Sequence, residues 1–197
     1  MKFTFLGTGT SQGVPVITCT CEVCQSSDAK DKRTRTSLMI QSESTSVVID
    51  TGPDFRFQML REQVQDLDAV VFTHGHKDHV AGLDDIRPFN YLLEKTIDVY
   101  AEESVQEVLK NEFSYAFRPH DYPGAPQIRL NTIDETPFEI GDIDFIPIRV
   151  MHKTLPVLGF RIGDFTYITD ANFIAEEELE KIKGSKVLVL NALRKEA

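Results

Sequence analysis

Three of the five histidines in this chain stand in one short segment, THGHKDH, as His74, His76 and His79, with Asp78 beside them. His74 and His76 are two residues apart, and in extended backbone such residues project to the same side. Two imidazoles on one side can bind one metal ion. Asp78 and His79 are adjacent, and at the start of a helix adjacent side chains point about 100° apart. They are better placed to reach a second ion, so the spacing predicts a two-metal site rather than a chance cluster of polar residues.

Three further residues stand at the ends of predicted strands, the position that His74 also occupies. His152 follows IDFIPIRV and Asp170 follows FTYIT, and ligands on several loops at one end of a scaffold are a common way to build a site. Taken singly, His152 could be a surface histidine and Asp170 a turn or cap residue. Asp50 ends SVVID, where it either orients a ligand histidine or bonds the backbone of the turn TGPD. His120, in a proline-rich loop, is expected to be solvated.

All the cysteines of the chain lie in CTCEVC, as Cys19, Cys21 and Cys24. Three thiolates at this spacing can bind one tetrahedral zinc ion, which would need a fourth ligand from elsewhere. A reducing compartment favours such a site over a disulfide. The alternative is three small loop residues that share no role.

The predicted elements place these side chains at strand ends. Strands are predicted for KFTFLG, for SLMIQ and SVVID as a hairpin, and for DAVVFT, a buried strand that leads directly into THGHKDH. Helices are predicted for DFRFQMLREQV, for ESVQEVLKNEF with Ser104 as its cap, and for AEEELEKIK. Later strands are IDVYA, IRLNTI, IDFIPIRV, VLGFRI, FTYIT and KVLVL, with a hairpin turn at Gly163 and Asp164. This order indicates an α/β fold of two sheets with helices outside them.

Composition restricts the class of function. The chain has 31 acidic and 21 basic residues, a formal net charge of -10, which argues against a protein that binds a nucleic-acid backbone. A small anionic substrate remains compatible, because bound divalent cations reverse the local charge. No segment approaches the roughly 20 apolar residues of a membrane span, and the N-terminus has no apolar run of signal-peptide length. We therefore expect a cytoplasmic protein without a membrane partner, folded as a single domain over residues 1–197.

Two other sequence features each allow a structural explanation as well as a ligand-binding one. Gly7, Gly9 and Gly13 are spaced one residue off the dinucleotide-binding fingerprint and are followed by no β-α-β unit. A tight turn lining the metal cleft is predicted for them rather than a nucleotide cradle. The basic run KDKRTR is predicted to be a solvated face, with Arg33 or Arg35 as a phosphate contact the alternative. No substrate-binding residue is assigned.

The order H-x-H-x-D-H after a buried strand, then a lone histidine, then an aspartate after a hairpin, resembles the metallo-β-lactamase superfamily. The resemblance implies an αββα sandwich with a two-metal centre, in which Zn or Mn is expected. One metal would be bound by His74, His76 and His152. The other would be bound by Asp78 and His79, and Asp170 would bridge the two. Catalytic roles are implied for Asp78, Asp170 and Asp50.

Within that superfamily, GTGTSQGVP, C-x-C-x-x-C and DTGPDFR are similar to the cyclic-phosphate phosphodiesterase of phosphonate catabolism. The resemblance implies a hydrolase of small, including cyclic, phosphodiesters, in which a hydroxide activated by two metals attacks phosphorus. It also implies one structural zinc at Cys19, Cys21 and Cys24. Alternatives are a metal-binding carrier like the B protein of pyrroloquinoline quinone biosynthesis, or a nuclease of the tRNA-processing type. Nucleic acid is expected only as a small nucleotide substrate, and a homodimer is left open.

The resemblance further implies a C-terminal continuation after NALRKEA. In the family it supplies a proton-donating histidine, one more ligand for the second metal and the fourth ligand of the zinc. We therefore expect the C-terminal part of the fold to be missing from this sequence, with weak or single-metal occupancy and low activity as a result.

Overall fold

The structure is a computed structural model that describes residues 1–118 and 124–193. His120 lies outside the described residues. The chain divides into two compact units, Met1–Asn131 and Thr132–Ala197. That residues 1–197 form one domain stays a prediction. No helix among the described residues is both long and apolar enough to span a membrane.

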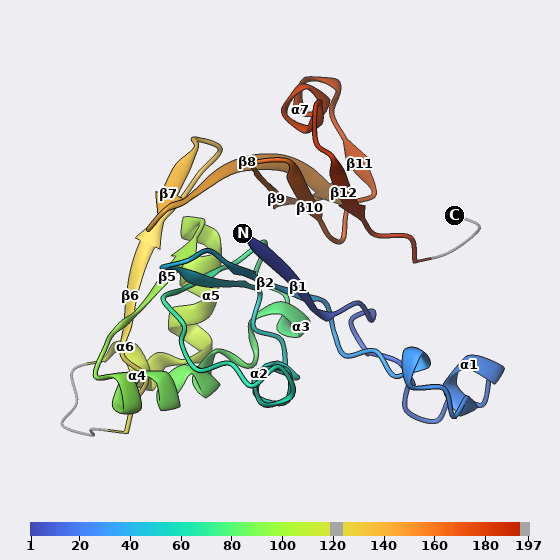
Figure 1. Cartoon of the computed structure of the whole chain (residues 1–197), viewed down its shortest axis with the longest axis horizontal. Helices are drawn as coiled ribbons and strands as arrows, with labels where there is room; N and C mark the ends of the chain where they lie inside the picture. Colours follow the sequence, from blue (N-terminus) through green and yellow to red (C-terminus); the bar gives the residue numbers. More distant parts are fainter. Residues whose placement is uncertain (119–123, 194–197) are drawn as a thin grey trace. The chain divides into compact units, whose positions relative to one another are not determined.

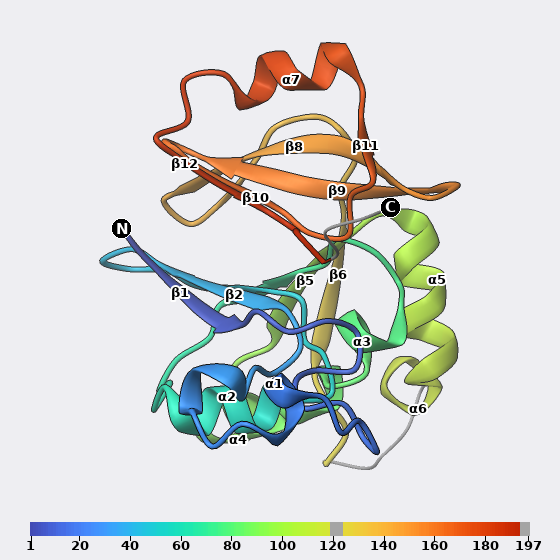
Figure 2. The ribbon, with the colours of Figure 1, turned by 90° about the vertical axis from the view of Figure 1, so that its right-hand side faces the viewer.

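The first unit is a mixed sheet with helices packed on it (Figures 1 and 2). Strands β1, β2 and β3 are antiparallel, as expected for the predicted hairpin, and β3, β4 and β5 are parallel. The sheet order is β1-β2-β3-β4-β5-β6. The strands are β1 Lys2–Gly7, β2 Ser37–Gln41, β3 Ser46–Ile49, β4 Ala69–Val71, β5 Ile97–Ala101 and β6 Ile128–Thr132. The helical segments are α1 Glu22–Gln25, η1 Ala29–Asp31, α2 Phe55–Arg61, α3 Lys77–Val80, η2 Leu83–Ile86, α4 Arg87–Leu93, α5 Glu103–Glu112 and α6 Ser114–Phe117.

The core of this unit lies between the sheet and the helices. Val48, Val70 and Val99 occupy equivalent places on β3, β4 and β5 and are fully buried in one cluster with Phe55 of α2 and Phe89 of α4. Because side chains alternate along a strand, every second residue of these strands faces the helices. The packing of these helices fixes the sheet edge at which β3 and β4 end.

The second unit is a mainly antiparallel sheet with one helix packed on it. The sheet order is β11-β8-β9-β10-β12, and β7 pairs with β8. The strands are β7 Phe138–Ile140, β8 Ile143–His152, β9 Leu155–Ile162, β10 Phe165–Ile168, β11 Phe173–Ile174 and β12 Val187–Leu190. Helix α7, Glu176–Ile182, covers one face of the sheet, where its Ile182 packs against the buried Ile148 and Val150 (Figure 2). The hairpin at Gly163 and Asp164 forms as predicted, and β12 adds to β10 in parallel.

Two local predictions need correction, and one helix was not predicted. Ser104 lies inside α5, and the residue that caps the helix is Glu102, whose backbone is extended. Helix α4 was not predicted, because RPFNYLL exposes Tyr91 and Leu92 and so lacks a clean apolar stripe. His152 is the last residue of β8, so the strand is longer than IDFIPIRV.

Candidate metal centre

The histidine motif connects a buried strand to a short helix. Strand β4 is fully buried and ends at Val71. His76 is the N-cap of α3, with extended backbone (φ -68°, ψ 150°), and Asp78 and His79 lie inside the first turn. His76 has the extended backbone that was predicted for it, and Asp78 and His79 lie at a helix start, as predicted.

The three imidazoles converge within the first unit. His74 Nε2 lies 3.1 Å from His76 Nδ1, and the ring centroids of His74 and His79 are 4.1 Å apart. His74 and His79 are almost completely buried, with exposed fractions of 2% and 0%. In a tetrahedral zinc site with Zn–N bonds of about 2.0–2.1 Å, two ligand nitrogens are about 3.3 Å apart. The separation of His74 Nε2 and His76 Nδ1 therefore fits two ligands of one ion.

The buried carboxylate of Asp50 orients His79. Asp50 follows β3, has a left-handed backbone (φ 62°) and is completely buried. Its Oδ2 lies 2.7 Å from His79 Nδ1. His79 therefore carries its proton on Nδ1, donates it to Asp50, and keeps the Nε2 lone pair for a metal. Of the two roles considered for Asp50, orienting a ligand histidine is the one that the geometry favours.

Thr73 extends this network to His74 and was missed by the sequence reasoning. Its hydroxyl lies 2.8 Å from Asp50 Oδ2 and 3.0 Å from His74 Nδ1, and its backbone N–H donates to Asp50 Oδ1 at 2.9 Å. A hydroxyl has one proton, so donation to Asp50 leaves Thr73 to accept the Nδ1 proton of His74. One carboxylate thus sets the tautomers of two histidines, His79 directly and His74 through Thr73. No local sequence signal marks Thr73, because its partner Asp50 lies 23 residues earlier in the chain.

Replacement of Thr73 by valine tests this relay. Valine keeps the shape of the side chain but leaves the buried His74 Nδ1–H and Asp50 Oδ2 each without one partner. We expect the affinity for Zn²⁺ to fall about 10- to 100-fold, the usual effect of removing an outer partner of a ligand histidine. Calorimetric titration of the metal-free protein measures it. Thr73→Ser, which keeps the hydroxyl, should bind Zn²⁺ nearly as well as the original protein, and equal losses in both variants would contradict the relay.

Asp78 is ionised beside His79. Its Oδ2 lies 3.4 Å from His79 Nε2. Partial burial raises the pKa of Asp78, but the hydrogen bond and the positive charge of His79 in its protonated form outweigh it and lower the pKa to about 2. When a metal ion replaces the Nε2 proton of His79, that nitrogen and the Asp78 carboxylate would be two ligands of the same ion.

Two glycines let the turn after Asp50 pack backbone to backbone on α3. A Cβ at Gly52 would lie 2.2 Å from the backbone oxygen of Asp78, and a Cβ at Gly82 would lie 2.1 Å from that of Gly52. The N–H of Gly82 donates to the oxygen of Thr51 at 2.8 Å. This contact sets the distance between the Asp50 turn and the helix that carries Asp78 and His79.

The Gly-rich loop is attached to the same turn by Arg35. Its guanidinium donates to the carboxylate of Asp54 at 3.0 Å and, through Nε, to the oxygen of Ser11 at 2.9 Å. Gly7 and Gly9 lie against the backbone of residues 33–35, where a Cβ would come within 2.7 Å of an oxygen. The loop is therefore a tight structural turn, and the Arg35 side chain is held by Asp54.

His152 and Asp170 lie in the second unit, at one edge of its sheet. His152 ends β8, and Asp170, with a left-handed backbone (φ 57°), follows β10 by two residues. The neighbouring Asn172 donates its backbone N–H to the oxygen of Met151 at 2.8 Å, so the two segments run side by side. That these side chains complete a metal centre with the histidines of the first unit stays a prediction.

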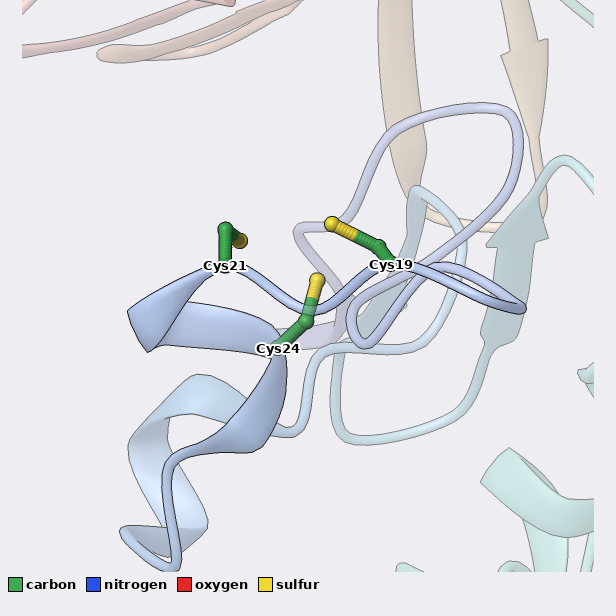
Figure 3. Close-up of side chains that lie close together, drawn as sticks. All are labelled: Cys19, Cys21 and Cys24. Carbon is green, nitrogen blue, oxygen red and sulfur yellow. The ribbon is translucent and has the colours of Figure 1, made fainter.

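The three cysteines form a separate cluster in the first unit, around α1 (Figure 3). Their sulfur atoms all lie within 4.8 Å of one another, as ligands of one ion would. Cys24 Sγ also accepts the backbone N–H of Val16 at 3.4 Å. This bond lowers the pKa of Cys24, but partial burial and the neighbouring thiols of Cys19 and Cys21 outweigh it and raise the pKa. Hydrogen bonds from the Cys24 backbone and from the neighbouring thiols lower the pKa of Cys21. The donor set and its geometry fit one zinc ion, and a fourth ligand is not identified among the described residues.

Comparisons with known proteins bear on the family and the fold of the chain. A family profile described as the beta-lactamase superfamily domain matches residues 45–197. A solved structure described as a new diphosphatase from the PhnP family is 40% identical, with a TM-score of 0.87, and the match covers 94% of this chain and 71% of that one. Zn²⁺-bound PqqB from Methylobacterium extorquens shares the fold at 20% identity and a TM-score of 0.79, over 98% of this chain and 73% of PqqB.

A curated relative from Porphyromonas gingivalis, named octanoyltransferase, is 43% identical over 98% of this chain. The chain spans only 39% of the length of that relative. The predicted α/β fold of the metallo-β-lactamase type is confirmed by the profile match and by the similarity to the diphosphatase structure. The chain belongs to the beta-lactamase superfamily and has the metallo-β-lactamase fold.

Proposed function

We propose that this protein is a metal-dependent phosphodiesterase that acts on small phosphodiesters, including cyclic ones. The observation that carries the proposal is the pair of ring nitrogens, His74 Nε2 and His76 Nδ1, that lie 3.1 Å apart beside the buried Asp50 and Thr73. Histidine tautomers fixed in this way hold lone pairs ready for a metal ion. The same groups would have little use in a purely structural loop.

The proposed ligand set is the one that the resemblance to the superfamily implies. His74, His76 and His152 would hold one ion, Asp78 and His79 would hold a second, and Asp170 would be a ligand shared by the two. Imidazole and carboxylate ligands suit Zn or Mn. Bound metals supply two things to phosphodiester hydrolysis: they lower the pKa of water, and they neutralise charge on the phosphoryl oxygens.

The protein groups have distinct tasks around the metals. Asp50 and Thr73 keep His79 and His74 in their ligand tautomers, which maintains the site without contact to substrate. The buried side of the motif, behind β4, keeps water away from the back of the histidines. The substrate must approach from the side of His76 and Asp78, which are the partly exposed members of the motif.

The choice of a phosphorus substrate is supported by the similarity to the PhnP-family protein, of which this chain covers 71%. The PhnP-family protein, 40% identical over 94% of this chain, is described as a diphosphatase. The octanoyltransferase name belongs to a relative of which this chain spans 39%, so it carries less weight for the reaction of these residues. The formal charge of -10 also favours a small substrate over a polynucleotide.

A structural zinc ion at Cys19, Cys21 and Cys24 is part of the proposal. The clustered sulfur atoms support it, as does the N–H···S contact from Val16. This ion would hold the irregular segment around α1 in place and would take no part in hydrolysis.

A substrate panel tests the proposed function. The protein is loaded with Zn²⁺ or Mn²⁺, its metal content is measured, and hydrolysis is followed for bis(4-nitrophenyl) phosphate, a cyclic nucleotide and 4-nitrophenyl acetate. Faster turnover of the phosphodiesters is the expected result. Cleavage of the acyl ester alone would contradict the proposal, and bound metal with no turnover would favour a carrier related to PqqB.

A further inference from the structure

Two residues at or beside the predicted metal ligands of the second unit have backbone conformations outside the regular sheet. Asp170 has a left-handed backbone (φ 57°), as has Lys153 (φ 58°), which directly follows His152, the last residue of β8. This conformation costs about 1–2 kcal/mol for a residue such as lysine and less for aspartate. It persists only where neighbouring groups fix it. Two asparagine side chains provide such contacts.

Asn191 pairs with the peptide groups next to Asp170. Its Oδ1 accepts the N–H of Ala171 at 2.9 Å, and its Nδ2 donates to the oxygen of Ala171 at 3.0 Å. A carboxamide with these two bonds replaces a missing strand neighbour. Asn191 directly follows β12, which itself pairs with β10 in parallel. The segment of Asp170 is thus tied to the end of β12.

Asn172 brackets His152 from both sides. Its backbone N–H donates to the oxygen of Met151 at 2.8 Å, and its side-chain Oδ1 accepts the N–H of Lys153. These two partners are the residues directly before and after His152. The bonds join the His152 turn to the segment 170–172, which Asn191 holds from the other side.

We propose that Asn191 and Asn172 are positioning residues that set the separation of Asp170 and His152 and thereby tune metal affinity. The inference rests on the proposed function, since it assumes that Asp170 and His152 are metal ligands. Asn191 contributes more to this positioning than Asn172, because the carboxamide of Asn191 makes both hydrogen bonds to Ala171. Of the two hydrogen bonds of Asn172, one comes from its backbone and one from its side chain. Only the side-chain bond is lost on substitution.

The test compares metal binding with folding in the whole chain. Metal-free protein is titrated with Co²⁺, and the visible absorption of the bound ion reports affinity and coordination. We expect Asn191→Ala and Asn191→Leu to weaken the affinity of at least one site about 10- to 100-fold and to alter the spectrum. Asn172→Ala should have a smaller effect. The midpoint temperature of thermal unfolding of the metal-free variants should fall by only about 2–4 °C, as expected for the loss of exposed hydrogen bonds.

Two controls separate positioning from general destabilisation. Asn111→Ala removes an exposed amide from α5 in the first unit and should leave both the affinity and the spectrum unchanged. Asn191→Gln keeps a carboxamide and should recover part of the affinity that Asn191→Ala loses. The proposal is overturned if both Asn191→Ala and Asn191→Leu bind Co²⁺ as the original protein does while His152→Ala does not.

The outcome is independent of the substrate. If the protein binds metals but cleaves no phosphodiester, the proposed function fails while the Co²⁺ affinities still decide the role of Asn191. If His74→Ala and Asp170→Ala leave Co²⁺ binding unchanged, no ion is bound by these residues and the inference is wrong.

Discussion

Substitution of Asp50 by alanine is expected to remove metal binding at the histidine motif and to destabilise the fold by about 3–5 kcal/mol, the cost of removing one partner from a buried charged network. Asp50 has no exposed surface and is the acceptor for His79 Nδ1, for the hydroxyl of Thr73 and for its backbone N–H. Three buried donors would lose their partner together. Chemical denaturation and metal titration measure the two effects.

Asp50→Asn separates the metal effect from the backbone effect. Asparagine tolerates the left-handed backbone of Asp50 and fills the same volume, but its NH₂ group must face one of the three donors. We therefore expect Asp50→Asn to be more stable than Asp50→Ala and still to bind metal at least about tenfold more weakly than the original protein. Asp66→Asn, at a carboxylate with 57% of its side chain exposed, serves as the control and should change neither property. Normal metal affinity in Asp50→Asn would show that the carboxylate does not orient the ligands.

The second large effect is expected from alanine at Gly52 or Gly82. Each added Cβ would lie only 2.2 Å or 2.1 Å from a backbone oxygen, so the turn and helix α3 must separate. We expect a loss of about 3 kcal/mol in the free energy of unfolding, the upper end for overpacked sites. Metal affinity should fall as well, because a Cβ at Gly52 would meet the backbone of Asp78, a proposed metal ligand.

Gly163→Ala is the matched control for these two glycines. Gly163 has a positive φ of 58° but nothing within 4 Å of its Cβ position. Alanine there should cost only about 1–2 kcal/mol, from backbone strain alone, and leave metal affinity unchanged. Comparable losses in all three variants would mean that the close approach of the turn to α3 is unimportant.

The sequence predicted those parts of the fold that repeat a local pattern. The apolar run before THGHKDH became the buried strand β4, and the hairpin of β2 and β3 formed where alternating residues flank a polar turn. Histidine spacing predicted that His74 and His76 share a side. Each of these predictions concerns residues that are close together in the sequence. The directions of their side chains follow from the local backbone geometry alone.

Contacts between distant segments could not be predicted in the same way. The relay from Asp50 through Thr73 joins the end of β3 to the segment after β4, and the contact of Gly52 with Asp78 joins a turn to helix α3. Nothing in the local pattern of Thr73 or Asn191 distinguishes a partner of a ligand from an ordinary turn residue. Helix α4 was missed for a related reason, because its side chains Tyr91 and Leu92 are exposed and obscure the amphipathic period.

The most direct test of the central claim is hydrolysis of bis(4-nitrophenyl) phosphate by the metal-loaded protein and by His76→Ala. His76 Nδ1 is half of the nitrogen pair on which the proposed function depends, and His76 is partly exposed, so its loss should leave the fold intact. We predict that His76→Ala binds less metal and has a kcat/KM lower by about a thousandfold, several kcal/mol of lost transition-state stabilisation. Equal rates in the two proteins at equal metal content would contradict a metal-dependent phosphodiesterase.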